Sequence, residues 1–154
     1  MKRLSYREGT WFAVPLKDGG YAAGVVARVG RRGVLFGYFF GPRRPAAPSL
    51  SDLEGLTPNN AVLVGKFGDL GLLDGRWPIV GKSDSWDREQ WPLPVFGRFE
   101  DLTGRAFRVE YSEKNLTSPV REVQVLREEL HGLPTNGLYG AVAIEAALAK
   151  SIRE

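Results

Sequence analysis

The chain has 154 residues, 43% of them hydrophobic and 25% charged, and a formal net charge of +3. Such a composition is typical of a globular protein with one core of its own, and it excludes a disordered chain. Because cysteine is absent and His131 is the single histidine, disulfides, thiolate metal sites, a cysteine nucleophile and a metal centre with several histidines are excluded.

The N-terminal stretch MKRLSYREG is charged and lacks the apolar segment of a signal peptide. No apolar run in the chain approaches the ~20 residues that a membrane-spanning helix needs. We therefore expect a cytoplasmic protein that does not cross a membrane.

The first forty residues predict three antiparallel strands, at 10–16, 21–29 and 34–40, because β-favouring residues alternate there with the glycine turns KDGG and GRRG. Pro15 cannot give a ladder hydrogen bond, so the first strand should be an edge or be bulged there. Gly24 and Gly37 indicate a bulge, a sharp bend or a close backbone approach. They favour a strongly curled sheet or a small barrel over a flat sheet.

The third of these strands contains FGYFF, whose alternate side chains point to opposite faces. Both faces are apolar, with Phe36, Tyr38 and Phe40 on one and Leu35 and Phe39 on the other. This pattern is typical of a central strand that is covered on both sides. We expect Gly41-Pro42 to end the strand and to turn Arg43 and Arg44 outward.

The rest of the chain predicts a proline-rich connection, further strands and one helix. The connection, 41–60, should hold one helical turn at 49–54, and 82–94 should form an ordered loop. Strands are expected at 61–67, near 76–80 after a turn at Asp74-Gly75, and at 95–99, 105–111 and 120–126.

The alanine-rich segment 138–152 predicts the single α-helix, with Asn136 as its N-cap. Its expected inner face consists of Leu138, Val142, Ala146, Ala149 and Ile152. The fold class is therefore mainly β (α+β): a strongly curled antiparallel sheet or partly open barrel with one C-terminal α-helix packed on it. We expect residues 1–154 to form one domain.

Catalytic constellations are scarce in this sequence. His131 is interpreted as a surface or loop-packing residue, and no G-x-S-x-G elbow or phosphate-binding loop is present. The carboxylates that could act together lie in turn-rich stretches, where acids are common: Asp69 with Asp74, Asp84 with Asp87 and Glu89, and Glu100 with Asp101. We expect no catalytic residue, no metal site and no cofactor.

Partner binding is the alternative, and the candidate residues fall in two stretches. Trp86 and Trp91 lie in a polar, proline-flanked loop together with Asp84 and Asp87. A loop tryptophan either anchors the loop or forms a hot spot for a partner. Arg43 and Arg44 belong to a basic N-terminal third, residues 1–50, which contains nine basic and two acidic residues. That third could bind nucleic acid, or could be a solvated rim.

Several stretches resemble the bacterial immunity protein 26 family, some of whose members carry a phosphotriesterase label. They are EGTWFAVPLKDGGYAAGVVAR, GVLFGYFFGPRRP, AVLVGKFGDLGLLDGRWPIVG and WPLPVFGR, and the resemblance covers most of residues 8–110. It implies a small β-rich cytoplasmic protein that neutralises a cognate toxin effector domain by direct, non-catalytic binding. The phosphotriesterase label does not fit a chain with one histidine.

The net charge conflicts with one form of this function. An immunity protein that imitated nucleic acid should be acidic, whereas the sequence pI is about 9.3. Either the toxin is not a basic nuclease, or the binding face uses the acidic region 69–101 while the arginines lie elsewhere. Nucleic-acid binding by the basic third and a small hydrolase remain the competing hypotheses.

Overall fold

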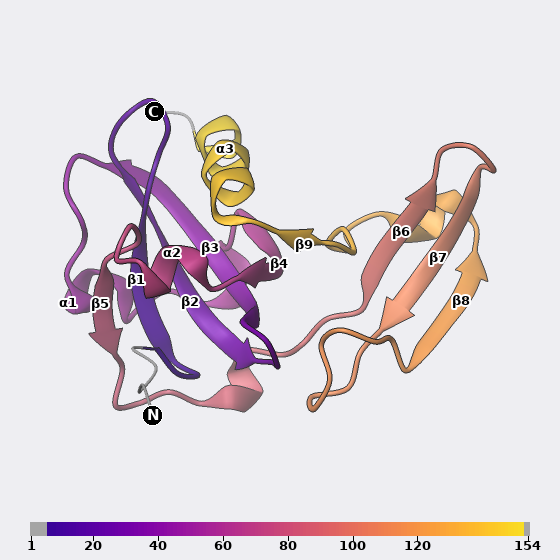
Figure 1. Ribbon diagram of the computed structural model, residues 1–154, viewed down its shortest axis with the longest axis horizontal. Coiled ribbons are helices and arrows are strands. Elements are labelled where there is room, and N and C mark those ends of the chain that lie inside the picture. Colours follow the sequence, from indigo (N-terminus) through magenta and orange to yellow (C-terminus); the bar gives the residue numbers. More distant parts are fainter. Residues whose placement is uncertain (1–5, 153–154) are drawn as a thin grey trace.

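Two β-sheets build the protein in the computed structural model, which describes residues 6–152 (Figure 1). The main sheet has the order β5-β1-β2-β3-β4-β9 and consists of β1 (Thr10–Pro15), β2 (Tyr21–Val29), β3 (Val34–Arg44), β4 (Leu63–Gly68), β5 (Ile79–Lys82) and β9 (Leu138–Tyr139). The small sheet has the order β6-β7-β8 and consists of β6 (Phe96–Glu100), β7 (Arg105–Glu110) and β8 (Arg121–Val125). The helical segments are α1 (Leu50–Leu53), α2 (Leu70–Leu73), α3 (Ala141–Ser151), η1 (Pro58–Asn60), η2 (Arg88–Gln90) and η3 (Arg127–Leu130).

The prediction of a mainly β protein with a C-terminal helix is confirmed, but neither sheet is closed or strongly curled. The two glycines that suggested a barrel have another physical reason. A Cβ at Gly24 would lie 2.6 Å from the ring of Phe12, and a Cβ at Gly37 would lie 2.6 Å from the carbonyl oxygen of Val25. These glycines therefore allow close packing rather than curvature.

Replacing Gly24 with alanine should lower the free energy of unfolding by about 1–3 kcal/mol, because the added methyl group overpacks the core against Phe12. Chemical denaturation measures this loss. Gly137→Ala is the matched control, since a Cβ there meets nothing within 4 Å. Equal stabilities of the two variants would contradict the close approach at Gly24.

The aromatic stretch of β3 is a central strand covered on both faces, as predicted. Leu35 and Phe39 belong to a core cluster that α3 covers, whereas Phe36, Tyr38 and Phe40 belong to a second cluster on the opposite face. The predicted end of the strand is wrong. β3 continues through Pro42 to Arg44, which pairs with Tyr21 of β2.

Pro15 pairs with β2 on one side of β1 and has no strand partner on the other side among the described residues. β5 pairs with β1 only over Thr10–Phe12, and the register shifts between Trp11 and Phe12. The residue therefore sits past the end of the neighbouring strand, although β1 itself is not an edge strand.

The C-terminal helix begins later than predicted, and a different face of it is buried. Leu138 and Tyr139 form β9, which runs parallel to β4, so Gly140 rather than Asn136 precedes the first helical residue. Within the helix the buried residues are Ile144, Glu145 and Leu148, whereas Val142 is 65% exposed. Of the predicted inner face, Ile152, directly after the helix, is buried in the core. With 11 residues, α3 is too short to span a bilayer, and no other helix between residues 6 and 152 is long and apolar enough to do so.

The small sheet is set apart from the main sheet in the ribbon view but is tied to it by a shared core (Figure 1). Phe96 of β6 packs against Phe36 of β3, with ring centroids 5.9 Å apart, and Leu116 joins the same cluster. Lys66 of β4 is also buried there, 6% exposed, and its Nζ donates to the carbonyl oxygen of Leu116 at 3.2 Å. Burial lowers the pKa of Lys66 to about 8.

The buried lysine makes stability depend on pH. Between the folded pKa of about 8 and the ordinary value of 10.5, the unfolded chain binds more protons at Lys66 than the folded chain does. Raising the pH from about 7 to about 10 should therefore increase the free energy of unfolding by about 2 kcal/mol more in the wild type than in Lys66→Met. The methionine side chain has no group that titrates. Denaturation of both proteins across this range is the test, and parallel pH profiles would contradict it.

Candidate partner-binding site

Trp91 anchors the loop that follows β5. It is 6% exposed, and its ring lies 5.8 Å from Trp11 and 5.2 Å from Tyr38, both in edge-on contact. The Tyr38 hydroxyl donates to the carbonyl oxygen of Pro92, and burial raises the pKa of Tyr38 to about 12, so the phenol keeps the proton that it donates. Of the two roles that a loop tryptophan can have, Trp91 takes the anchoring one.

Trp86 lies outside Trp91 and remains partly exposed. The two indoles stack with centroids 5.4 Å apart and an interplanar angle of 17°. A Cβ at Gly9 would lie 2.9 Å from the Trp86 ring, so only glycine fits beneath it. The Trp86 Nε1 donates to Glu8 at 3.3 Å. The ring is thus held in place while part of its surface faces solvent.

These tryptophans border a pocket of about 420 Å³, which we call the tryptophan pocket. Its wall includes Trp11, Glu54, Ser83, Trp86, Gln90 and Trp91. Ser83 is buried, and its hydroxyl donates to the exposed Glu54 carboxylate at 3.3 Å. The arrangement combines flat aromatic walls with one carboxylate and several hydrogen-bonding groups, which suits the binding of a single side chain.

A chain of ion pairs fixes the loop beside the small sheet. Arg28 is 3% exposed, and its guanidinium pairs with Glu113. Arg88 pairs with Glu113 at 3.3 Å and with Glu8 at 3.1 Å. The hydrogen bond from Arg28 holds the pKa of the Glu113 carboxyl below its ordinary value, with Coulombic help from Arg28 and Arg88. These contacts hold the loop, the main sheet and the turn after β7 together.

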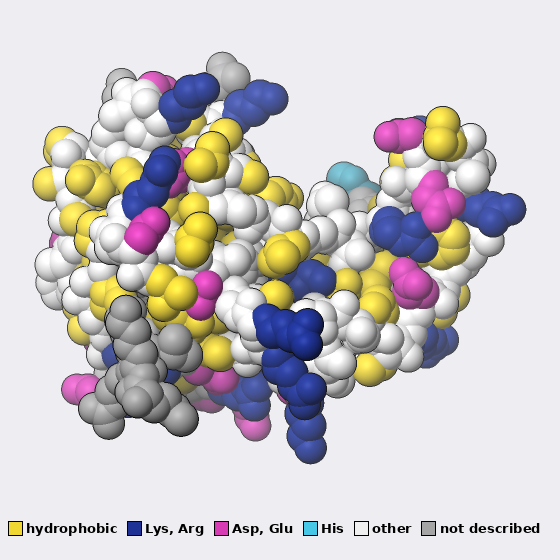
Figure 2. Space-filling model, in the orientation of Figure 1, with side chains coloured by type: hydrophobic (Ala, Val, Ile, Leu, Met, Phe, Trp, Pro, Cys, Tyr) yellow, Lys and Arg dark blue, Asp and Glu magenta, His cyan; other side chains and the backbone are white. Residues whose placement is uncertain are grey.

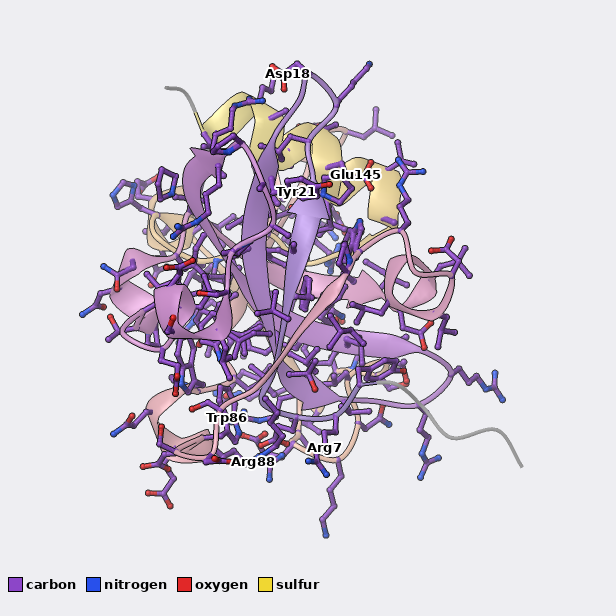
Figure 3. The ribbon with its side chains drawn as sticks, turned by 90° about the vertical axis from the view of Figure 1, so that its left-hand side faces the viewer. Arg7, Asp18, Tyr21, Trp86, Arg88 and Glu145 are labelled. Carbon is purple, nitrogen blue, oxygen red and sulfur yellow. The ribbon has the colours of Figure 1, made fainter. Side chains whose placement is uncertain are left out.

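The predicted partner-binding residues do not lie together. Asp84 and Asp87 are exposed on the loop beside Trp86, and Asp87 also caps η2 by accepting from the Glu89 amide at 3.1 Å. Arg43 and Arg44 lie toward the other end of the main sheet: Arg43 pairs with Asp18 at 2.6 Å, and Arg44 pairs in register with Tyr21. Figure 3 shows Asp18 and Tyr21 at the end opposite Trp86 and Arg88.

The arginines are also less available than predicted. The Arg43 side chain is only 14% exposed, because it donates to Asp18 and to the carbonyl oxygen of Gly19 across the β1–β2 turn. Arg44 is half-buried. The expectation of an outward arginine turn is wrong, since β3 continues through this segment.

The basic N-terminal third is dispersed among the described residues. Arg28 is buried and Arg43 is paired, whereas Arg31 and Arg32 lie at the β2–β3 turn. Lys2 and Arg3, which contribute to the sequence count, lie outside the described residues. On the face drawn in Figure 2, dark-blue side chains occur at several separate places rather than in one patch.

Several of the carboxylates considered for catalysis make structural contacts. Asp69 accepts from the Tyr6 hydroxyl at 2.5 Å, and Asp74 accepts from the Arg76 amide at 2.9 Å. Glu100 pairs with Arg98 at 2.5 Å. His131 is exposed after η3, as predicted for a surface histidine. Within residues 6–152, no group of three or more histidine and carboxylate side chains is placed to hold a metal ion.

Trp11 and Glu54 are among the pocket residues that the sequence did not indicate as candidates. Trp11 lies in the predicted first strand and is only 2% exposed, but its ring also borders the pocket. Glu54 follows α1 in a connection with no local signal for a site. Its role depends on Ser83, 29 positions away, to which it is hydrogen-bonded.

Comparison with known proteins gives one match. Searches of curated proteins and of solved structures found nothing that matches this chain. A protein-family model described as Immunity protein 26 matches residues 7–108, which is more than half of the chain and contains every residue of the tryptophan pocket. The chain therefore belongs to the immunity protein 26 family.

Proposed function

We propose that this protein acts in the cytoplasm and neutralises a cognate toxin by binding its effector domain directly, without catalysis, through the surface around the tryptophan pocket. The observation that carries the proposal is the partly exposed Trp86, held rigidly over a pocket within the family-matched region. Rigid, partly buried aromatic side chains are the groups that most often dominate the binding energy of protein interfaces.

The charge distribution supports this surface over the other end of the main sheet. The segment around Trp86 exposes Asp84, Asp87 and Glu89, and its one arginine, Arg88, is paired with two glutamates. A basic chain can therefore present an acidic binding surface, which suits a basic toxin face. The conflict between the pI and the immunity function then disappears.

Nucleic-acid binding by the basic third has less support. A phosphate-binding patch needs several exposed basic side chains on one face. Here Arg28 is buried against Glu113 and Arg43 is paired with Asp18. A hydrolase likewise has less support, because Asp69, Asp74 and Glu100 are each engaged in hydrogen bonds or an ion pair within the protein.

The direct test is protection of cells that express the toxin encoded beside this gene. We expect the wild-type protein to restore growth and to retain the toxin in a pulldown, and Trp86→Ala to restore less growth and to retain less toxin. Val142→Ala is the matched control, since Val142 is a 65% exposed apolar residue on α3, away from the pocket. No toxin gene nearby, or growth restored equally by wild type and Trp86→Ala, would contradict the proposal.

A further inference from the structure

The tryptophan pocket has the chemistry of a cation site. Trp11, Trp86 and Trp91 present indole surface to one cavity of about 420 Å³. The face of an indole carries negative potential and attracts a cation more strongly than any other side-chain ring does. Trp91 is fixed by its edge-on contact with Trp11, and Trp86 is fixed by stacking on Trp91, so the walls need no rearrangement to receive a group.

A carboxylate completes the site. Glu54 borders the same cavity and accepts a hydrogen bond from Ser83, whose hydroxyl also contacts Ser85 at 2.9 Å. None of the ion pairs within residues 6–152 involves Glu54. Its exposed carboxylate thus has no cationic partner among the described residues, and it can pair with a cation that enters the pocket.

We infer that the tryptophan pocket receives an arginine side chain of the toxin, with its guanidinium against the indoles and bonded to Glu54. The inference rests on the proposed function, because the toxin supplies the arginine. A guanidinium is flat, so it can lie along an indole face, and its five N–H donors can reach several acceptors at once. The pocket offers such acceptors in Glu54 and the Gln90 amide oxygen. An ammonium group would use fewer of them.

A pair of small probes tests the site in the full protein. N-acetyl-arginine methylamide carries the guanidinium, and N-acetyl-citrulline methylamide has the same shape without the charge. Each is titrated while the indole N–H signals of the tryptophans are followed by NMR, with Trp86→Phe to assign the Trp86 signal. We expect a saturable shift of the Trp86 signal with the arginine probe, and about tenfold weaker binding of the citrulline probe.

Glu54→Gln should weaken binding of the arginine probe by about tenfold, since it keeps the side-chain shape and removes the charge. Glu128→Gln is the matched control, because Glu128 is an exposed acid on η3 that does not border the pocket, and this variant should bind the probe as the wild type does. Equal binding of the two probes, wild-type affinity in Glu54→Gln, or no saturable shift would overturn the inference.

The toxin separates this inference from the proposed function. If the toxin binds and Glu54→Gln leaves its affinity unchanged, the arginine site is wrong while neutralisation by binding stands. If the toxin does not bind at all, the proposed function fails, and the probe titration still decides whether the pocket takes a guanidinium. Glu54→Gln should weaken toxin binding by about tenfold if both are right.

Discussion

Replacing Trp91 with alanine is expected to lower the free energy of unfolding by about 3–5 kcal/mol, the range typical of a buried large aromatic residue. The indole is 6% exposed and contacts the rings of Trp11, Tyr38, Phe40 and Trp86. Its removal leaves a cavity between the loop and the main sheet that these neighbours cannot fill. Chemical denaturation followed by circular dichroism measures the loss.

The comparison with Trp86→Ala makes this expectation specific. Trp86 is partly exposed and lies on the outer side of Trp91, which is 6% exposed, so the loss of Trp86 should cost less stability. If Trp91→Ala were no less stable than Trp86→Ala, Trp91 would not be the anchor of the loop. A defect in protection by Trp91→Ala reports on folding, and it therefore gives no information about the binding surface.

Replacing Trp86 with alanine is expected to weaken toxin binding by about 30-fold or more, which corresponds to about 2 kcal/mol. The truncation removes the aromatic wall of the pocket that is held in place by Gly9 and Glu8 and is partly open to solvent. Calorimetric titration with an inactivated toxin effector domain measures the affinity.

Two controls accompany this titration. The variant should keep a native circular dichroism spectrum, and Val142→Ala should bind as the wild type does, because Val142 lies on α3 away from the loop. Unchanged affinity of folded Trp86→Ala would remove Trp86 from the interface, whatever the toxin's contact surface is.

Local patterns were enough to predict the first half of the main sheet. β1, β2 and the start of β3 alternate regularly between glycine turns, and FGYFF has two apolar faces that only a covered strand can bury. The end of β3 could not be predicted, because Arg44 stays in the sheet through its pairing with Tyr21. The strand β9 likewise depends on a distant part of the chain. Leu138 of β9 pairs with Lys66 of β4, which is 72 positions earlier in the sequence.

The candidate site was predicted only in part, for a related reason. The loop tryptophans were identifiable, but which one is buried depends on residues that are distant in sequence, such as Trp11 beneath Trp91 and Gly9 beneath Trp86. The pairing of Arg43 with Asp18, which separates the arginines from the loop, is likewise a tertiary contact. Composition indicated charges and rings without indicating which of them share a surface.

Hydrogen–deuterium exchange of the protein with and without the inactivated toxin domain tests the central claim most directly, since it maps the contact surface without any substitution. Binding through the tryptophan pocket predicts that the toxin slows exchange in the segments around 54–58 and 83–91, which border the pocket. Exchange at the β1–β2 turn and around Arg43 should be unchanged. Protection confined to that turn and Arg43, or to the small sheet, with no change around Trp86, would contradict it.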